Sequence, residues 1–167
     1  MSKNRPILTV AIPTRNRPEY LKQSLSSVLN QDFQDKRVIV MDNAPDIDVK
    51  DLVAELGKGE VEYIKFEENL GIIGGWNRAI EACDTKYLSI FHDDDVMLPG
   101  FLTKSIKALE ENPTAMMSYT QANKVDPELK YISIWSDLYP NEGLISGHDY
   151  LLYSIEKGCC VTIAPTV

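Results

Sequence analysis

Short apolar runs, each followed by a polar loop and then by a segment with helical spacing, recur along the first two-thirds of the chain. A near-continuous apolar run is the pattern of a parallel strand covered on both faces, and apolar residues three or four positions apart indicate an amphipathic helix. The order of strand, loop and helix therefore repeats. The predicted strands are residues 7–12, 38–41, 61–66 and 87–91, and the predicted helices are residues 18–30, 49–57 and 99–112, with one more after the glycines at 71–75.

The pattern weakens towards the C-terminus. Residues 115–119 form an apolar run that predicts a fifth strand, while residues 131–135 are compatible with a strand and residues 148–155 with a short helix. Strands that alternate with helices imply an α/β fold with a mainly parallel sheet and helices on both faces. Ligands of such sheets bind at the carboxyl ends of the strands, and the polar loops after the first, second and fourth strands lie at that edge.

Size and charge restrict the class of protein. A chain of 167 residues is long enough for one domain with a sizeable core, and we predict a single domain over residues 1–167. A formal net charge of −8 and a pI near 4.8 argue against binding nucleic acid, because phosphate backbones are bound by dense lysine and arginine. An anionic ligand would therefore need a metal ion or local hydrogen-bond donors.

Cysteine usage and the N-terminal segment bear on the compartment. The three cysteines include the adjacent Cys159 and Cys160, which implies no disulfide framework and favours a reducing compartment. The apolar run at residues 7–12 is interrupted and is followed by Pro13, so it is too short for a signal peptide or a membrane span. We predict no transmembrane segment in this chain and a cytoplasmic location, with peripheral attachment at the inner face of the membrane left open. The oligomeric state is not predicted.

Three consecutive aspartates, Asp93 to Asp95, follow the fourth predicted strand. Carboxylates at a strand end repel one another and lose hydration, so the cluster gains little unless a cation sits there. Oxygen ligands suit Mg²⁺ or Mn²⁺, and because Mg²⁺ usually takes only one or two carboxylates, the cluster indicates a site for a metal ion and a diphosphate. A solvated acidic turn is the alternative, which the position at the end of a buried strand disfavours.

The polar loops together resemble the donor-binding half of a family 2 glycosyltransferase with the GT-A fold. The matching pieces are residues 12–17 after the first strand, residues 40–43 after the second, and Asp93-Asp94-Asp95 in the place of the family's DxD motif. Residues 69–71 and 74–78 resemble the corresponding stretch of the rhamnosyl- and galactofuranosyl-transferase branch. The order and spacing of the motifs carry the resemblance, because each motif alone is weak.

The resemblance implies inverting transfer of a sugar from a UDP- or dTDP-sugar to a glycan or lipid-linked acceptor, with Mn²⁺ or Mg²⁺ as cofactor. The ion would stabilise charge on the departing diphosphate. Asp94 and Asp95 are the candidates for the metal, and Asp93 for a ribose or sugar hydroxyl. The nucleotide-binding residues that the resemblance implies are Pro13, Thr14, Arg15, Asp42, Asn43, Asn69, Gly71, Asn77, Arg78 and Asp93.

Several residues also have plainer interpretations. Many relatives have, at the position of Asn43, an aspartate that pairs with uracil. An asparagine still accepts a hydrogen bond there, so a pyrimidine base remains the expectation. Arg15 could be an ordinary surface charge, and Trp76 is expected to pack its helix. His92 is expected to be a packed histidine, with a role beside the acidic cluster as the alternative.

No general base is recognised. Members of the resembled family are usually longer and carry an acidic base in their second half, and none of the downstream acids Asp137, Glu142 and Asp149 has that context. We therefore expect this chain to lack the acceptor-binding part, and an inactive fragment or a non-catalytic nucleotide-sugar-binding module is an alternative. A nucleotidyltransferase is a second alternative, but the loop after the first strand has no glycine where such an enzyme needs one.

Overall fold

The computed structural model describes residues 5–134 and 143–157. The chain divides into two compact units, residues 1–104 and residues 105–166, and each unit is described by itself. The single domain predicted over residues 1–167 stays a prediction.

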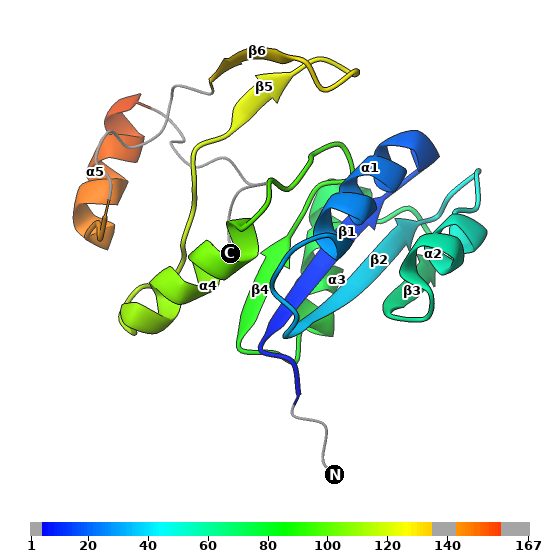
Figure 1. Ribbon diagram of the computed structural model, residues 1–167, viewed down its shortest axis with the longest axis horizontal. Coiled ribbons are helices and arrows are strands. Elements are labelled where there is room, and N and C mark those ends of the chain that lie inside the picture. Colours follow the sequence, from blue (N-terminus) through cyan, green and yellow to red (C-terminus); the bar gives the residue numbers. More distant parts are fainter. Residues whose placement is uncertain (1–4, 135–142, 158–167) are drawn as a thin grey trace. The chain divides into compact units, whose positions relative to one another are not determined.

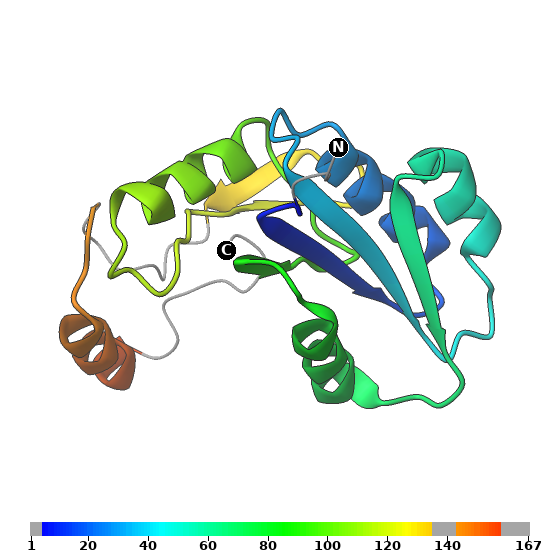
Figure 2. The same ribbon diagram turned by 90° about the horizontal axis from the view of Figure 1, so that it is seen from below.

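The first unit is built on a four-stranded parallel sheet with the strand order β3-β2-β1-β4. Helices α1 and α2 cover one face of this sheet and α3 covers the other (Figures 1 and 2). The predicted parallel sheet with helices on both faces is therefore confirmed for this unit. The elements are β1 (Leu8–Thr14), α1 (Pro18–Leu29), β2 (Lys36–Asn43), α2 (Lys50–Gly57), β3 (Val61–Phe66), α3 (Gly71–Ala82) and β4 (Tyr87–Ile90).

The two central strands form the core of this unit. All residues of β1 except Pro13 are buried, as are the last six residues of β2, which explains why both strands read as near-continuous apolar runs. Helix α1 turns Leu21, Leu25 and Val28 towards the sheet at helical spacing, and all three are fully buried. Apolar burial of this kind contributes about 1.5–3 kcal/mol to the free energy of folding for each large side chain, so the sheet is a stable support for its loops.

The carboxyl ends of β1, β2 and β4 lie at one edge of the sheet. In the parallel register Thr14 is opposite Asp42, and Ala11 is opposite Ile90. The backbone N–H of Phe91 continues this pairing by donating to the carbonyl of Ala11. The segments that follow these strands, including the three aspartates, are therefore brought together by the sheet.

The second unit contains a hairpin and a helix. Strands β5 (Asn123–Val125) and β6 (Tyr131–Ile134) pair antiparallel, and α5 (Gly147–Lys157) follows. The strand expected from residue 131 and the helix expected at residues 148–155 are thus confirmed, except that Trp135 lies outside the described residues. Helix α4 (Phe101–Glu111) spans the boundary between the units. Among the described helices, none has the length and hydropathy needed to cross a membrane.

The fifth strand predicted at residues 115–119 is wrong. These residues are irregular apart from an isolated bridge at Tyr119, and the side chain of Met116 is almost fully exposed. The strand β5 lies further along the chain because a turn closed by Asp126 and Lys130 folds it onto β6. An apolar run becomes a strand only where a neighbouring strand takes its backbone hydrogen bonds.

Candidate functional site

The loops after β1 and β4 are joined through a buried hydrogen bond. The hydroxyl of Thr14, at the end of β1, donates to Oδ2 of Asp93 at 2.7 Å. Asp93 is largely buried, and burial raises the pKa of its carboxyl, while the Thr14 hydrogen bond and the charge of Arg17 act in the opposite direction. Two of the predicted residues are therefore in direct contact at the edge of the sheet.

The acidic segment after β4 forms a compact group of possible metal ligands. Ligand atoms of His92, Asp94 and Asp95 all lie within 4.8 Å of one another. Burial is also the main cause that raises the pKa of Asp95, so its ionised form lacks some of the stabilisation that water would give. A divalent cation would supply that stabilisation, which is the usual reason for carboxylates to gather at such a place.

His92 packs against α3, and its ring also lies beside the acidic cluster. Its ring stacks on Trp76 of α3, with ring centroids 5.9 Å apart and an interplanar angle of 16°. Its Nδ1 lies 3.8 Å from Oδ2 of Asp95, and its Nε2 is buried without a partner within the described part of the chain. Adjacency to the aspartates is the only hint of this role in the sequence, because the stacking that holds the ring depends on α3.

This donor set fits a divalent ion. Two carboxylates and one imidazole nitrogen can serve Mn²⁺, and Mg²⁺ would use mainly the oxygen atoms. Asp94 and Asp95, which the sequence singled out for the metal, both belong to the group, and His92 adds a third candidate that sequence reasoning did not propose.

The loops after β1 and β2 are joined by a second set of contacts. Oδ1 of Asn16 accepts from the backbone N–H groups of Asp46 and Ile47 at 2.7 and 3.1 Å, and its Nδ2 donates to Oδ2 of Asp46 at 2.7 Å. Arg15 donates through Nε to the carbonyl of Ala44 at 3.2 Å and pairs with Asp46 at 3.5 Å. We call these contacts between residues 15–16 and 44–47 the loop latch.

Asp42 precedes Asn43 at the end of β2 and has no exposed surface. Its Oδ2 accepts a 2.7 Å hydrogen bond from the Tyr63 hydroxyl on β3, while Oδ1 is buried with no partner among the described residues. Burial is the largest cause that raises the pKa of this carboxyl. The position favours a supporting role for Asp42 over direct contact with a base.

Asn43 connects the end of β2 to the start of α3. Its Nδ2 donates to Oδ1 of Asn69 at 3.1 Å and to the carbonyl of Gly71 at 3.3 Å, and its Oδ1 accepts from the N–H of Leu70 at 2.9 Å. Gly71 has a φ of +64°, a conformation that glycine adopts readily. Three predicted residues, Asn43, Asn69 and Gly71, thus form one bonded group that shapes the loop before α3.

The remaining predicted residues lie on or against α3. Pro13 approaches this helix closely, since a Cβ at Gly75 would lie 3.9 Å from the Cβ of Pro13. Asn77 is exposed, and Arg78 is exposed and pairs with Glu81 at 2.8 Å. The structure therefore brings Arg78 to Glu81, and its role in nucleotide binding stays a prediction.

We expect Asn43→Asp to lower the free energy of unfolding by about 1–3 kcal/mol, because a carboxylate would face Asn69 Oδ1 and the Gly71 carbonyl without a hydrogen to donate. Urea unfolding followed by circular dichroism measures this, and Asn43→Ser, which keeps one donor, should lose less. Equal stability of Asn43→Asp and the wild type would show that the amide donors are not needed.

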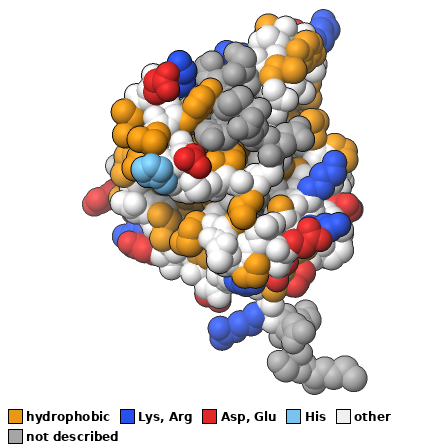
Figure 3. Space-filling view, turned by 90° about the vertical axis from the view of Figure 1, so that its left-hand side faces the viewer, with side chains coloured by type: hydrophobic (Ala, Val, Ile, Leu, Met, Phe, Trp, Pro, Cys, Tyr) orange, Lys and Arg blue, Asp and Glu red, His pale blue; other side chains and the backbone are white. Residues whose placement is uncertain are grey.

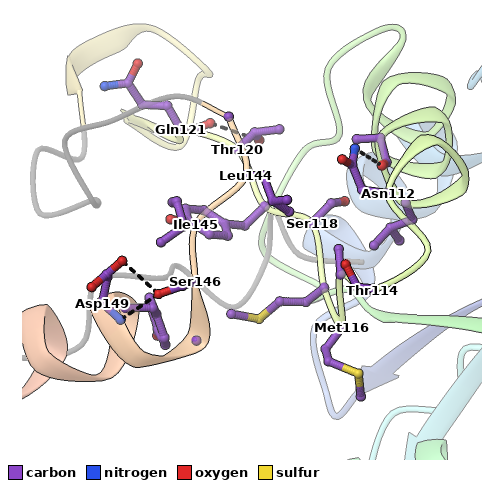
Figure 4. A pocket seen from close by; sticks show the side chains of 18 residues that line it. Asn112, Thr114, Met116, Ser118, Thr120, Gln121, Leu144, Ile145, Ser146 and Asp149 are labelled. Atoms are coloured by element: carbon purple, nitrogen blue, oxygen red, sulfur yellow. Dashed lines mark hydrogen bonds between the residues drawn. The ribbon is translucent and has the colours of Figure 1, made fainter.

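The second unit has a cavity of about 910 Å³ near the start of α5 (Figure 4). It is lined by residues of the segments 108–121 and 143–150. Asp149, one of the acids weighed as a general base, accepts from the Ser146 hydroxyl at 2.7 Å and donates its N–H to the same oxygen at 3.1 Å. Ser146 is therefore the N-cap of α5, and the Asp149 carboxylate holds the capping hydroxyl in place, which gives Asp149 a structural role. Asp137 and Glu142 lie outside the described residues.

Large hydrophobic side chains are exposed in the second unit. Met116, Leu144 and Ile155 are 95%, 68% and 74% exposed. Figure 3 shows one face of the molecule, on which hydrophobic side chains reach the surface. Exposed apolar surface of this kind commonly marks contact with other protein segments or with ligands.

Comparison with known proteins assigns the chain to a family. The family model described as glycosyl transferase family 2 matches residues 9–162. The chain belongs to glycosyl transferase family 2. Membership confirms the family that the loops resemble and favours a glycosyltransferase over a nucleotidyltransferase, while the rhamnosyl- and galactofuranosyl-transferase branch stays a prediction.

Curated relatives of this glycosyl transferase family 2 chain include enzymes of bacteria and archaea. An uncharacterized glycosyltransferase of Methanocaldococcus jannaschii is 34% identical over 113 residues, which are 65% of this chain and 39% of the relative. The GalNAc(5)-diNAcBac-PP-undecaprenol beta-1,3-glucosyltransferase of Campylobacter jejuni is 32% identical over 110 residues, which are 64% of this chain and 35% of that enzyme. The chain thus spans less than two-fifths of the length of these relatives.

Solved structures of glycosyltransferases share the fold. The mannosyltransferase PcManGT of Pyrobaculum calidifontis, in complex with GDP-Man and Mn²⁺, aligns over 72% of this chain and 37% of its own with a TM-score of 0.63 and 21% identity. S. aureus TarS 1–349, in complex with UDP-GlcNAc, aligns over 64% of this chain and 32% of its own with a TM-score of 0.58 and 22% identity. The predicted GT-A-type α/β fold is therefore confirmed.

Proposed function

We propose that this chain binds a UDP- or dTDP-sugar together with Mn²⁺ or Mg²⁺ and supplies the donor-binding part of an inverting glycosyltransferase. The observation that carries the proposal is the group formed by His92, Asp94 and Asp95 beside the buried hydrogen bond from Thr14 to Asp93. Possible metal ligands and a rigidly held carboxylate thus occupy the edge where α/β sheets bind their ligands.

The residues after β4 divide the work at the donor. Asp94, Asp95 and His92 would hold the divalent ion, which when bound would offset the charge that develops on the departing diphosphate. Asp93 is oriented by Thr14 and accepts a hydrogen bond from a ribose or sugar hydroxyl. Trp76 holds the His92 ring by stacking and so fixes one side of the metal group.

The loop latch and the Asn43 group form the nucleotide pocket. Pro13, Thr14 and Arg15 line it from the end of β1 and the loop that follows, and Asn69 and Gly71 line it from the segment where α3 begins. Asn43 acts through the backbone of residues 69–71, and Asp42 supports β2 from beneath. Asn77 and Arg78 extend the pocket along α3 towards the diphosphate.

The acceptor is a glycan or a lipid-linked saccharide. One relative is named for its action on a saccharide linked to undecaprenol diphosphate, which is the support for a lipid-linked acceptor. Such an acceptor would bring a cytoplasmic protein to the inner face of the membrane. The exposed apolar side chains of the second unit are compatible with contact to this partner.

Isothermal titration calorimetry with UDP, dTDP and GDP in the presence of Mn²⁺ tests the proposal. We expect both pyrimidine nucleotides to bind at least about tenfold more tightly than GDP, which corresponds to roughly 1.4 kcal/mol of discrimination by the pocket. Binding of GDP as tight as that of UDP would contradict the pyrimidine assignment, and failure of all nucleotides to bind would contradict the function.

A further inference from the structure

Arg17 reaches from the loop after β1 into the acidic group after β4. Its Nη1 lies 2.9 Å from Oδ2 of Asp94 and 3.5 Å from Oδ1 of Asp93. The backbone of Arg17 is held where α1 begins, because its carbonyl accepts from the N–H of Leu21 at 2.9 Å and Pro18 follows it. The guanidinium therefore extends towards the aspartates from a fixed backbone position.

The carboxylate that Arg17 holds is also a candidate metal ligand. Asp94 belongs to the group with His92 and Asp95, so the guanidinium and a divalent ion draw on the same side chain. The side chains of Arg17 and Asp94 are both about half exposed. Ion pairs with this exposure are weak and are easily replaced by a stronger partner.

A bound dication would also repel the guanidinium. The guanidinium of Arg17 lies within hydrogen-bond distance of Asp94. A cation bound to Asp94 would therefore lie close to a second positive charge, and the two charges would repel each other. The arginine thus lowers the affinity of the acidic group for a metal ion while it offsets the mutual repulsion of the aspartates.

We propose that Arg17 is an internal counter-ion that competes with the divalent ion for Asp94 and leaves this carboxylate when the ion binds. The inference rests on the proposed function, because it takes the aspartate group as the metal site. Arg17 is in this view a positioning residue that sets the concentration of metal ion at which the site fills.

Titration of the nucleotide-free protein with Mn²⁺, with free Mn²⁺ counted by electron paramagnetic resonance, tests this. Arg17→Gln should lower the Kd for Mn²⁺ by roughly three- to tenfold, since both the competing ion pair and the repulsion are lost. The Kd of Arg17→Lys should lie between those of the wild type and Arg17→Gln, because a lysine keeps the charge without the planar fork of donors. Lys22→Gln removes one positive charge from an exposed position of α1 and should change the Kd by less than about twofold, since exposed charges are screened.

A second readout follows the guanidinium itself. The Nε–Hε signal of Arg17 in ¹⁵N-labelled protein should shift on titration with diamagnetic Mg²⁺, and the shift should saturate with the same Kd as binding. Mn²⁺ binding that Arg17→Gln leaves unchanged or weakens, with the variant folded by circular dichroism, would overturn the inference alone. Absence of Mn²⁺ binding in both wild type and Arg17→Gln would overturn the metal site and the inference with it.

Discussion

Asp95→Ala should abolish the gain in UDP affinity that Mn²⁺ gives. Asp95 lies in the group of possible metal ligands, and partial burial raises the pKa of its carboxyl. The net charge of −8 and three adjacent carboxylates repel a diphosphate until a cation joins them. In calorimetry we expect the variant in Mn²⁺ to bind UDP as weakly as the wild type in EDTA, a loss of about tenfold or more.

The matched control is Asp51→Ala, which removes an exposed carboxylate from the first turn of α2. It should leave the Mn²⁺-dependent affinity within about twofold of wild type, because exposed charges at a distance are screened by salt. Nucleotide affinity that EDTA does not change would rule out a metal bridge. A loss in Asp95→Ala that is as large in EDTA as in Mn²⁺ would assign Asp95 to the nucleotide and not to the metal.

The sheet of the first unit could be predicted from the sequence because parallel strands buried on both faces leave a strong apolar signal. The runs at residues 7–12 and 38–41 are the buried centres of β1 and β2. Their carboxyl ends then place the polar loops at one edge without further information. The run at residues 115–119 gave a similar signal, yet these residues are irregular apart from the bridge at Tyr119, so a short apolar run alone does not establish a strand.

The contacts within the site could be predicted less well, because they depend on side chains from segments far apart in the chain. The sequence placed Asn43 at a strand end, but its hydrogen bonds run to residues 69–71. The stacking of His92 on Trp76 and the bonds from Asn16 to residues 46 and 47 likewise need the folded loops. Residue types at strand ends therefore indicated where a site lies, and the tertiary contacts decide what each residue does there.

Asn16→Ala should raise the Kd for UDP in Mn²⁺ by about tenfold or more, because the substitution destabilises the loop latch in two ways. Three hydrogen bonds from the Asn16 side chain are lost, each worth about 0.5–1.5 kcal/mol. The residue also has a φ of +57°, which asparagine tolerates and which costs alanine about 1 kcal/mol or more. An opened latch would free Arg15 and the loop after β1, so the nucleotide would have to order them on binding.

Two further variants separate these costs. Asn16→Gly keeps the positive φ without strain, so the difference between the alanine and glycine variants measures the backbone term. Asp46→Ala removes the acceptor of the Asn16 Nδ2 hydrogen bond and the exposed ion pair with Arg15 but leaves both backbone N–H groups bonded to Asn16. It should therefore weaken UDP binding less than Asn16→Gly does. If Asn16→Gly binds UDP as tightly as wild type while Asn16→Ala does not, the hydrogen bonds of the latch are unimportant and only the backbone conformation matters. If neither variant changes the Kd, the loops after β1 and β2 do not need each other to form the nucleotide pocket.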